Sequence, residues 1–328
     1  MPWPTRLPHE DNLTEKPPTV ASNHDPLVSV IMNGYNCEKY LKQAIDSVFA
    51  QTYVNWEIIF WDNASTDATQ SIASNYGPKL RYFRSATNTT LGAARNSALE
   101  QAQGEFIAFL DTDDYWLPEK LALQVAILQE NREVDFIYSN YRLLNHQTGY
   151  QSKGLRKQQP AGNVFGRFLQ HYPVNLQTVL FRRSALDDLD HLFDNQLTLA
   201  EEFDLFMRIL YRSKAHYLDA PTAVYRIHSN MSSIRKIEQY PEENRLILIK
   251  LLALDPRIAH DYAREIMAFE GKIAFWQARA DMHYHKSADA RRILKPYTHK
   301  SLIFLGLYLS TFSYTIWNFL LETKRRFN

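Results

Sequence analysis

Short strand-like runs alternate with segments of helical periodicity from residue 27 to about residue 140. Runs rich in β-branched and aromatic residues predict strands at 27–32, 56–61, 79–83, 105–110 and 134–139. Between them, apolar residues recur at helical spacing, as in 38–51 and 91–102. Strands that alternate with helices in this way indicate an α/β fold with a mostly parallel central sheet flanked by helices.

The pattern changes after residue 140. Residues 140–175 are rich in Gly, Gln and Asn and have no clear period, so they are predicted to form loops that shape a second pocket. Strand character returns at 176–182, and 200–212 predicts an amphipathic helix with a carboxylate-rich first turn. From about residue 237 the pattern is helical throughout, which indicates a helical C-terminal extension.

Polar side chains follow three of the predicted strands at the point where each strand ends. In parallel sheets these carboxyl ends meet at one edge, where ligands bind. The side chains are therefore expected to converge on one crevice, and they belong to Asn33, Tyr35, Asp62, Asp111, Asp113 and Asp114.

Three carboxylates within four positions after the fourth strand require an explanation. Like charges this close repel unless a cation or hydrogen-bond donors offset them. Mg²⁺ or Mn²⁺ is one such cation, commonly held by carboxylates together with substrate phosphates, although acidic residues also occupy turns and helix caps. A phosphatase of the haloacid-dehalogenase type also places Asp-x-Asp after a strand, but its small following residue is replaced here by Tyr115. Neither a Walker phosphate loop nor Gly-x-Gly-x-x-Gly is present.

Composition excludes some classes of function. The net charge of +1 provides no field for attracting nucleic acid. The single cysteine, Cys37, rules out an intramolecular disulfide and fits a reducing compartment. Residues 1–25 are polar and proline-rich without a signal-peptide core, and are predicted to be a flexible lead-in to a cytoplasmic protein.

Residues 301–321 carry no charge and precede a basic cluster at 324–326. The length could span a bilayer, but its hydrophobicity is diluted by Ser310, Thr311, Ser313, Thr315 and Asn318. A helix in the membrane interface, with its basic end on anionic lipid, fits equally well, as does a buried or oligomer-forming helix.

Five ordered blocks resemble family 2 inverting glycosyltransferases with the GT-A fold, particularly bacterial enzymes that build surface polysaccharides. The resemblance covers residues 27–235 and implies a catalytic domain at 26–236 and a helical region at 237–328. The blocks are "VSVIMNGYNCEKYLKQAIDSVFAQTYVNWEIIFWDNASTDAT", "LGAARNSAL", "GEFIAFLDTDDYWLPEKL", "AEEFDLFMRI" and "AVYRIHSNMSS".

The resemblance implies a role for residues near a nucleotide. Asn33 and Tyr35 match positions that contact the base, and Asp62 and Asn63 match an acidic pair that reads base and ribose. The second member is often Asp, but the Asn63 amide can still accept a hydrogen bond, so a UDP-sugar and a dTDP-sugar both remain open as donors. Arg95 matches a basic residue that could balance diphosphate charge.

The resemblance also implies the residues that do the chemistry. Asp111 and Asp113 match the Asp-x-Asp that holds a divalent cation, with Asp114 as an extension, and His228 matches a position near the metal and pyrophosphate. Glu202 aligns with the general base, with Glu201 as the alternative. Glu201 and Asp204 are otherwise expected to stabilise the helix N-terminus through its dipole.

The expected function is metal-dependent, inverting transfer of a sugar from a nucleoside diphosphate to a hydroxyl of a glycan or lipid-linked glycan. The expected location is the cytoplasm or the inner face of its membrane. A haloacid-dehalogenase-like phosphatase and a non-catalytic sugar-nucleotide-binding protein are the alternatives, and the intact Asp111, Asp113 and Glu202 argue against the second. Donor sugar, acceptor, linkage and oligomeric state have no signal in the sequence.

Overall fold

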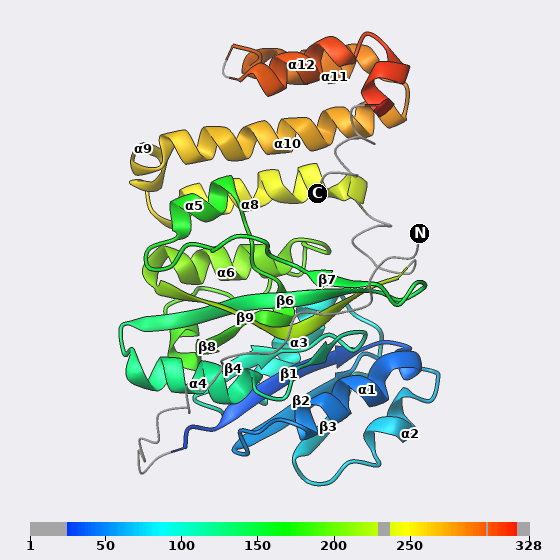
Figure 1. Ribbon diagram of the computed structural model, residues 1–328, viewed down its shortest axis with the longest axis vertical. Coiled ribbons are helices and arrows are strands. Elements are labelled where there is room, and N and C mark those ends of the chain that lie inside the picture. Colours follow the sequence, from blue (N-terminus) through cyan, green and yellow to red (C-terminus); the bar gives the residue numbers. More distant parts are fainter. Residues whose placement is uncertain (1–24, 229–236, 300, 320–328) are drawn as a thin grey trace, which may run out of the picture.

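The computed structural model describes residues 25–228, 237–299 and 301–319. Figure 1 shows a mixed sheet with helices on both faces and, beyond one face, successive layers formed by α6, by α8 with α5, by α10, and by α11 with α12. The predicted lead-in and the basic cluster at 324–326 lie outside the described residues. The protein is therefore an α/β structure with a stack of C-terminal helices, as the hydrophobic pattern predicted.

The first half of the sheet is parallel. Its strands have the order β3-β2-β1-β4, with β1 at Val28–Gly34, β2 at Trp56–Asp62, β3 at Leu80–Arg84 and β4 at Phe106–Phe109. The connecting helices are α1 (Glu38–Phe49), α2 (Thr69–Ala73) and α3 (Leu91–Leu99), and α4 (Lys120–Glu130) follows β4. This part confirms the predicted alternation of strands and helices.

The second half of the sheet is mostly antiparallel, which the sequence pattern did not predict. β8 (Leu180–Arg182) runs antiparallel to both β4 and β6 (Val134–Asn145), whereas β9 (Lys214–Ile227) runs parallel to β6. The short β5 (Tyr115–Trp116) and β7 (Gln151–Lys153) pair antiparallel with β9 and β6. The sheet is therefore mixed.

Two predictions within residues 140–182 were right only in part, since 180–182 do form a strand and side chains between 168 and 174 do line a second cavity. The expected loop region contains the end of β6, β7 and α5 (Phe165–Gln170). The expected strand at 176–182 starts as a 3₁₀ turn, Leu176–Thr178, in which the Asn175 side chain caps the Gln177 amide. The sequence shows no helical or strand periodicity here, because elements this short and partly exposed contain too few buried positions to form a repeating apolar pattern.

Successive side chains along the buried strands point to opposite faces of the sheet and pack in two separate hydrophobic cores. Val30 and Met32 of β1 pack with α1 and α4, whereas Ile31 points to the opposite face and packs in the core formed with α3, α5 and α6. All are almost fully buried, because helices cover both faces of the sheet. Two covered faces hold the strand ends, and thus the side chains that follow them, in fixed positions.

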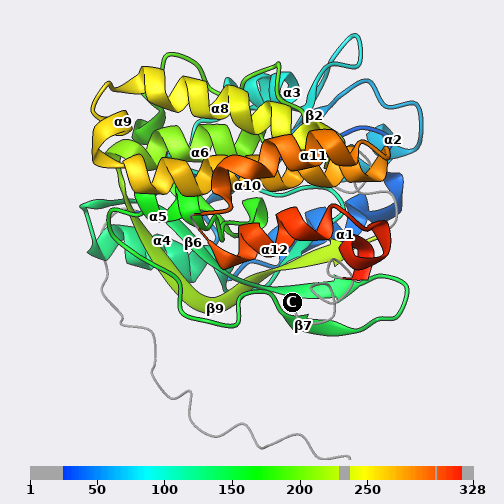
Figure 2. The same ribbon diagram turned by 90° about the horizontal axis from the view of Figure 1, so that it is seen from above.

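The C-terminal helices are stacked in layers beyond α6 (Glu201–Arg212), which covers one face of the sheet (Figure 1), and Figure 2 shows this stack from above. They are α8 (Tyr240–Leu254), α9 (Ile258–Asp261), α10 (Ala263–His283), α11 (Ser287–Leu294) and α12 (Leu302–Ser310). The uncharged segment is broken by a turn at Thr311 and Phe312, and Trp317 then returns to a small core with α10 and α11. Within the described part of the chain, no helix has both the length and the apolar character needed to cross a bilayer.

Gly104 lies where the turn before β4 passes directly over β1. A Cβ at this position would lie 2.5 Å from the backbone nitrogen of Ser29 and 2.7 Å from the carbonyl oxygen of Leu27. Gly104→Ala is therefore expected to lower the free energy of unfolding by about 1–3 kcal/mol, the cost of overpacking a tight site. The measurement is urea unfolding followed by circular dichroism.

The matched control is Gly77→Ala, because a Cβ there would meet nothing within 4 Å. Equal stability of the two variants would contradict the close packing of β1 against this turn.

Candidate active site

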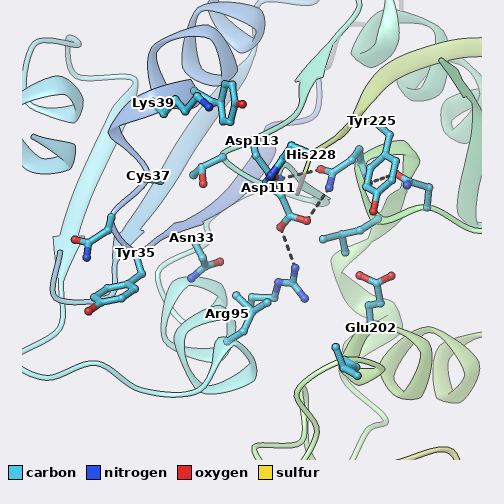
Figure 3. Close-up of a pocket in the computed structure, with 18 of the residues that line it drawn as sticks. Asn33, Tyr35, Cys37, Lys39, Arg95, Asp111, Asp113, Glu202, Tyr225 and His228 are labelled. Carbon is cyan, nitrogen blue, oxygen red and sulfur yellow. Dashed lines mark hydrogen bonds and ion pairs between the residues drawn. The ribbon is translucent and has the colours of Figure 1, made fainter. Parts of the chain in front are cut away.

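A cavity of about 660 Å³ opens at the carboxyl ends of β1 and β4. It brings together seven of the ten side chains that the sequence selected, namely Asn33, Tyr35, Arg95, Asp111, Asp113, Glu202 and His228. Figure 3 shows Asn33 and Tyr35 on one side and Glu202 on the other, with the two aspartates between them. Asp62, Asn63 and Asp114 do not line it. The roles assigned to all ten remain predictions.

The end of β1 offers an aromatic face and an amide to the cavity. Tyr35 is 52% exposed, and the Nδ2 of Asn33 is buried without a hydrogen-bond partner among the described residues. The chain turns at Asn36, whose φ of 50° is stabilised when its side chain accepts a hydrogen bond from the backbone of Thr66. An unpaired buried donor is costly, so a ligand that accepts from Asn33 would relieve that cost.

Asp62 and Asn63 instead hold the neighbouring loops together. The Asp62 carboxylate is fully buried and accepts from the Tyr82 hydroxyl at 2.6 Å and from Arg84 at 2.8 Å. The Asn63 amide donates to the carbonyl of Thr89 and accepts from its backbone N–H. Both side chains are thus engaged with protein groups beside the cavity.

Asp111 is oriented by three polar contacts. Arg95 donates to its Oδ1 at 2.9 Å, and the Gln177 amide donates to Oδ2 at 2.8 Å while accepting from the Asp111 backbone N–H. Gln177 is almost fully buried, in the 3₁₀ turn that precedes β8. The carboxylate after β4 therefore has a fixed direction.

Asp113 and Asp114 are tied to the end of β9. The Oδ2 of Asp113 lies 2.9 Å from Nε2 of His228, and the Oδ1 of Asp114 accepts from the backbone N–H of Arg226 at 2.7 Å. The Arg226 guanidinium also donates to the carbonyl of Asp113. Burial and the neighbouring Asp111 charge raise the pKa of Asp113, and burial raises the pKa of Asp114 well above its usual range.

The donor set of this cluster suits a hard divalent cation. Ligand atoms of Asp111, Asp113 and Asp114 lie within 4.8 Å of one another. The Oδ2 of Asp114 is buried and has no partner among the described residues, and such an oxygen is costly unless a ligand compensates it. Carboxylates with an adjacent imidazole are ligands for Mn²⁺ and Mg²⁺. A bound cation would also offset the burial and the repulsion between carboxylates that raise the pKa values of Asp113 and Asp114.

Arg95 links this cluster to the opposite wall. Its guanidinium is 2% exposed and donates to Asp111 and to Glu201 Oε1, the second at 2.8 Å. Glu201 is the first residue of α6 and lies 106 positions away in the sequence. Two carboxylates on one buried guanidinium form an ion-paired bridge between the end of β4 and the start of α6.

Glu202 follows in the same helical turn and lines the cavity. Burial raises its pKa to about 8, with Arg95 lowering it and Glu201 raising it to lesser extents. A carboxylate with a pKa near neutrality, facing a cavity, has the properties of a general base. Glu201 differs because its carboxylate is already bound to Arg95.

The expected role of Asp204 at the helix N-terminus was incomplete. Asp204 does lie in the first turn of α6, but it is fully buried and paired with Arg208 at 2.7 Å and Lys250 at 2.8 Å. Removing one member of a buried ion pair costs more than losing a helix-dipole contact. Asp204 therefore has a structural role, and substituting it is expected to destabilise the protein.

Sequence reasoning missed Gln177 and Arg226 as supports of the cluster. For Arg226 a signal exists, because alternation along a strand places it on the same side as His228. Gln177 had no local signal, since it meets Asp111 only through the antiparallel packing of β8 against β4. Long-range pairing, not local pattern, creates that contact.

Residues 29–189 match the model of the family described as glycosyl transferase family 2. An Escherichia coli protein is 31% identical over 224 residues, covering 67% of this chain and 85% of that protein. It carries the name UDP-Glc:alpha-D-GlcNAc-diphosphoundecaprenol beta-1,3-glucosyltransferase WfaP.

Solved structures show the same fold. The S. aureus TarS 1–349 structure in complex with UDP-GlcNAc is 24% identical with a TM-score of 0.66, covering 88% of this chain and 82% of that one. A Pyrobaculum calidifontis mannosyltransferase, PcManGT, in complex with GDP-Man and Mn²⁺, has a TM-score of 0.58 at 18% identity, with coverage of 92% and 86%. These likenesses confirm the GT-A fold.

Proposed function

The chain belongs to glycosyl transferase family 2, and on that premise we propose that it is a metal-dependent, inverting enzyme whose acceptor is a lipid-linked glycan. The observation that carries this proposal is one cavity holding a divalent-cation ligand set on one wall and a carboxylate of raised pKa on the other. Cation and base are the two components that direct displacement from a nucleoside diphosphate requires. The name of the Escherichia coli relative WfaP includes a GlcNAc-diphosphoundecaprenol, which supports a lipid-linked acceptor.

The donor in this proposal is a UDP- or dTDP-sugar. Tyr35 supplies a stacking face and the unpaired Nδ2 of Asn33 a donor for a carbonyl group of the base. Asp62 and Asn63 would contribute to donor binding indirectly, because their hydrogen bonds hold the loops beside the cavity in place. TarS was solved with UDP-GlcNAc, which supports a uridine nucleotide.

Asp111, Asp113 and Asp114 would hold Mn²⁺ or Mg²⁺, with His228 beside them. The cation, when bound, stabilises the negative charge that develops on the departing diphosphate. Arg95 orients Asp111, and Arg226 orients Asp114 through its backbone. Because these contacts exist before any ligand arrives, little reorganisation is required when the donor binds.

Glu202 would remove the proton of the acceptor hydroxyl. As that oxygen forms its bond to the anomeric carbon, the bond from this carbon to the diphosphate oxygen breaks on the opposite face, and the proton passes to the Glu202 carboxylate. Attack opposite the leaving group inverts the anomeric configuration. The position of Glu202 on the cavity wall opposite the aspartates supports this arrangement (Figure 3).

The phosphatase alternative would require Asp111 to act as a nucleophile. Both Asp111 oxygens already accept hydrogen bonds, from Arg95 and Gln177, which lowers their reactivity toward phosphorus. The family match also favours sugar transfer. Release of nucleoside diphosphate from a nucleotide-sugar, rather than phosphate from a phosphomonoester, separates the two activities.

Contact with a membrane surface forms part of the proposal. Side chains of α12, the following turn and the helical segment 314–319 expose an apolar set, namely Leu302, Ile303, Leu309, Phe312 and Ile316, each more than half exposed. Residues 290–321 contain no Asp or Glu but include Arg291, Arg292, Lys295 and Lys300. Apolar side chains next to cationic ones are typical of a surface that rests on anionic lipid, on the cytoplasmic side where the single unpaired cysteine stays reduced.

Asp113→Asn tests the metal. Removing one anionic oxygen ligand is expected to weaken Mn²⁺ binding by at least about tenfold. Mutating a group that merely hydrogen-bonds to a metal ligand already lowers metal affinity by about that factor. Isothermal titration with Mn²⁺ in the presence of UDP measures this affinity. The exposed Asp261→Asn on α9 is the control. Wild-type metal affinity in Asp113→Asn would refute the ligand assignment.

Glu202→Gln tests the base. The substitution keeps shape but removes basicity, so transfer is expected to fall at least about a hundredfold while UDP and Mn²⁺ still bind. In the unaltered enzyme, kcat/KM for the acceptor is expected to rise with pH through about 8, because only the deprotonated Glu202 accepts a proton. A coupled assay of UDP release from pH 6 to 10 measures both.

The exposed Glu242→Gln on α8 is the control for that substitution. If Glu201→Gln abolishes transfer while Glu202→Gln remains active, the base is Glu201 and the alignment of this block is shifted by one position.

Substitutions on α12 test the membrane contact more cleanly than deletion, since removing 301–328 would uncover the core around Trp317. The double change Ile303→Glu and Leu309→Glu is expected to abolish sedimentation with phosphatidylglycerol vesicles, because it places two charges in the apolar contact. Val54→Glu, at a site 67% exposed outside this surface, is the matched control. Unchanged sedimentation of the double variant would refute the proposed surface.

A further inference from the structure

A second cavity, of about 200 Å³, adjoins the first one at Leu199 and Glu202. Glu202 lines both cavities. The second is enclosed by α5 and its following loop, by the start of α6, and by α8 and α10 of the C-terminal stack. Its position makes Glu202 reachable from two directions.

Two buried polar atoms in this cavity have no partner. The Oδ1 of Asn244 belongs to a side chain that is 1% exposed, and it accepts no hydrogen bond from any described residue, although Nδ2 donates to the carbonyl of Tyr240. The hydroxyl of Tyr172 is likewise buried and unpaired within the described residues. Each such group costs free energy that a ligand with hydroxyl groups would recover.

Aromatic rings form much of the rest of the wall, together with aliphatic side chains such as Leu169 and Ile273. Tyr172 meets Phe203 edge-on at 4.8 Å between ring centroids, and Tyr240 meets Trp276 at 5.5 Å. Rings combined with hydrogen-bonding groups match the two kinds of surface on a sugar, which has apolar C–H faces and a polar hydroxyl edge.

Lys272 of α10 provides a cation in the same cavity. It forms no ion pair with any described carboxylate, and burial lowers its pKa. An unpaired and partly buried ammonium favours an anionic ligand, which would restore the charged form.

We infer that this second cavity binds the sugar of the acceptor, with its reacting hydroxyl at Glu202, its other hydroxyls at Asn244 and Tyr172, and a phosphate attached to that sugar at Lys272. The inference rests on the proposed glycosyltransferase function and deepens it by assigning the acceptor class, a sugar phosphate or diphosphate. Glu202 then stands between donor and acceptor, which enter from separate cavities.

A sugar fits better than the alkyl chain of a lipid carrier. An alkyl chain would leave the Oδ1 of Asn244 and the Tyr172 hydroxyl buried without a hydrogen-bond partner among the described residues, which is unfavourable for both groups. A sugar hydroxyl can donate to the first and accept from or donate to the second.

The test is calorimetric titration of the full chain, saturated with UDP and Mn²⁺, using N-acetylglucosamine 1-phosphate, glucose 1-phosphate and galactose 1-phosphate as probes. At least one is expected to bind, and Lys272→Met and Asn244→Leu are each expected to weaken it about tenfold or more. UDP affinity should stay unchanged in both variants. Lys286→Met, at an exposed site, is the control.

Three outcomes overturn the inference. The first is that no probe binds, the second that binding is unaffected by either substitution, and the third that decyl phosphate, which lacks a sugar, binds as tightly as the best probe. If Asn244→Leu fails to fold, Lys272→Met alone decides the second outcome, since its side chain is only partly buried. Failure of the unaltered protein to bind UDP would instead refute the proposed function.

Discussion

The arrangement of the site depends on the two ion pairs that the buried guanidinium of Arg95 forms. The guanidinium sits between Asp111 at the end of β4 and Glu201 at the start of α6, and so fixes the metal-binding wall relative to the wall that carries Glu202. Charges removed from water are tolerated only when they are paired, so neither carboxylate can move away without leaving the other charges uncompensated. The Gln177 amide and the Arg226 backbone extend the same constraint to the neighbouring aspartates.

Local pattern predicted the first half of the fold because its strands are continuous apolar runs covered on both faces. β1, β2 and β4 are such apolar runs. The polar residues that follow them gather at the cavity and its aspartate cluster, except for Asp62 and Asn63. Those two could not be placed from sequence, because whether a carboxylate at a strand end faces the cavity or the loop depends on partners such as Arg84 and Tyr82. The family resemblance selected Glu202, and the structure adds physical differences between the two glutamates, since Glu201 is ion-paired with Arg95 whereas Glu202 lines both cavities.

The second half resisted prediction because its elements depend on distant partners. β5 and β9 pair across more than a hundred positions, and β8 is three residues long. The sequence indicated that residues 140–175 shape a second pocket but could not identify its other walls, since Tyr172, Asn244 and Lys272 come from three separate elements that meet only when the C-terminal helices pack on α6. Those helices therefore complete the site as well as extend the chain.

The thiol of Cys37 can serve as a chemical reporter of nucleotide binding in the cavity that it lines. The chain has no other cysteine, and this one lines the proposed nucleotide cavity beside Thr69. Burial raises the pKa of its thiol to about 11, so only about one molecule in ten thousand carries the reactive thiolate at pH 7. Alkylation should consequently be slow, confined to a single atom and sensitive to whether a nucleotide covers it, which makes the rate of thiol modification a direct measure of donor occupancy without any engineered label.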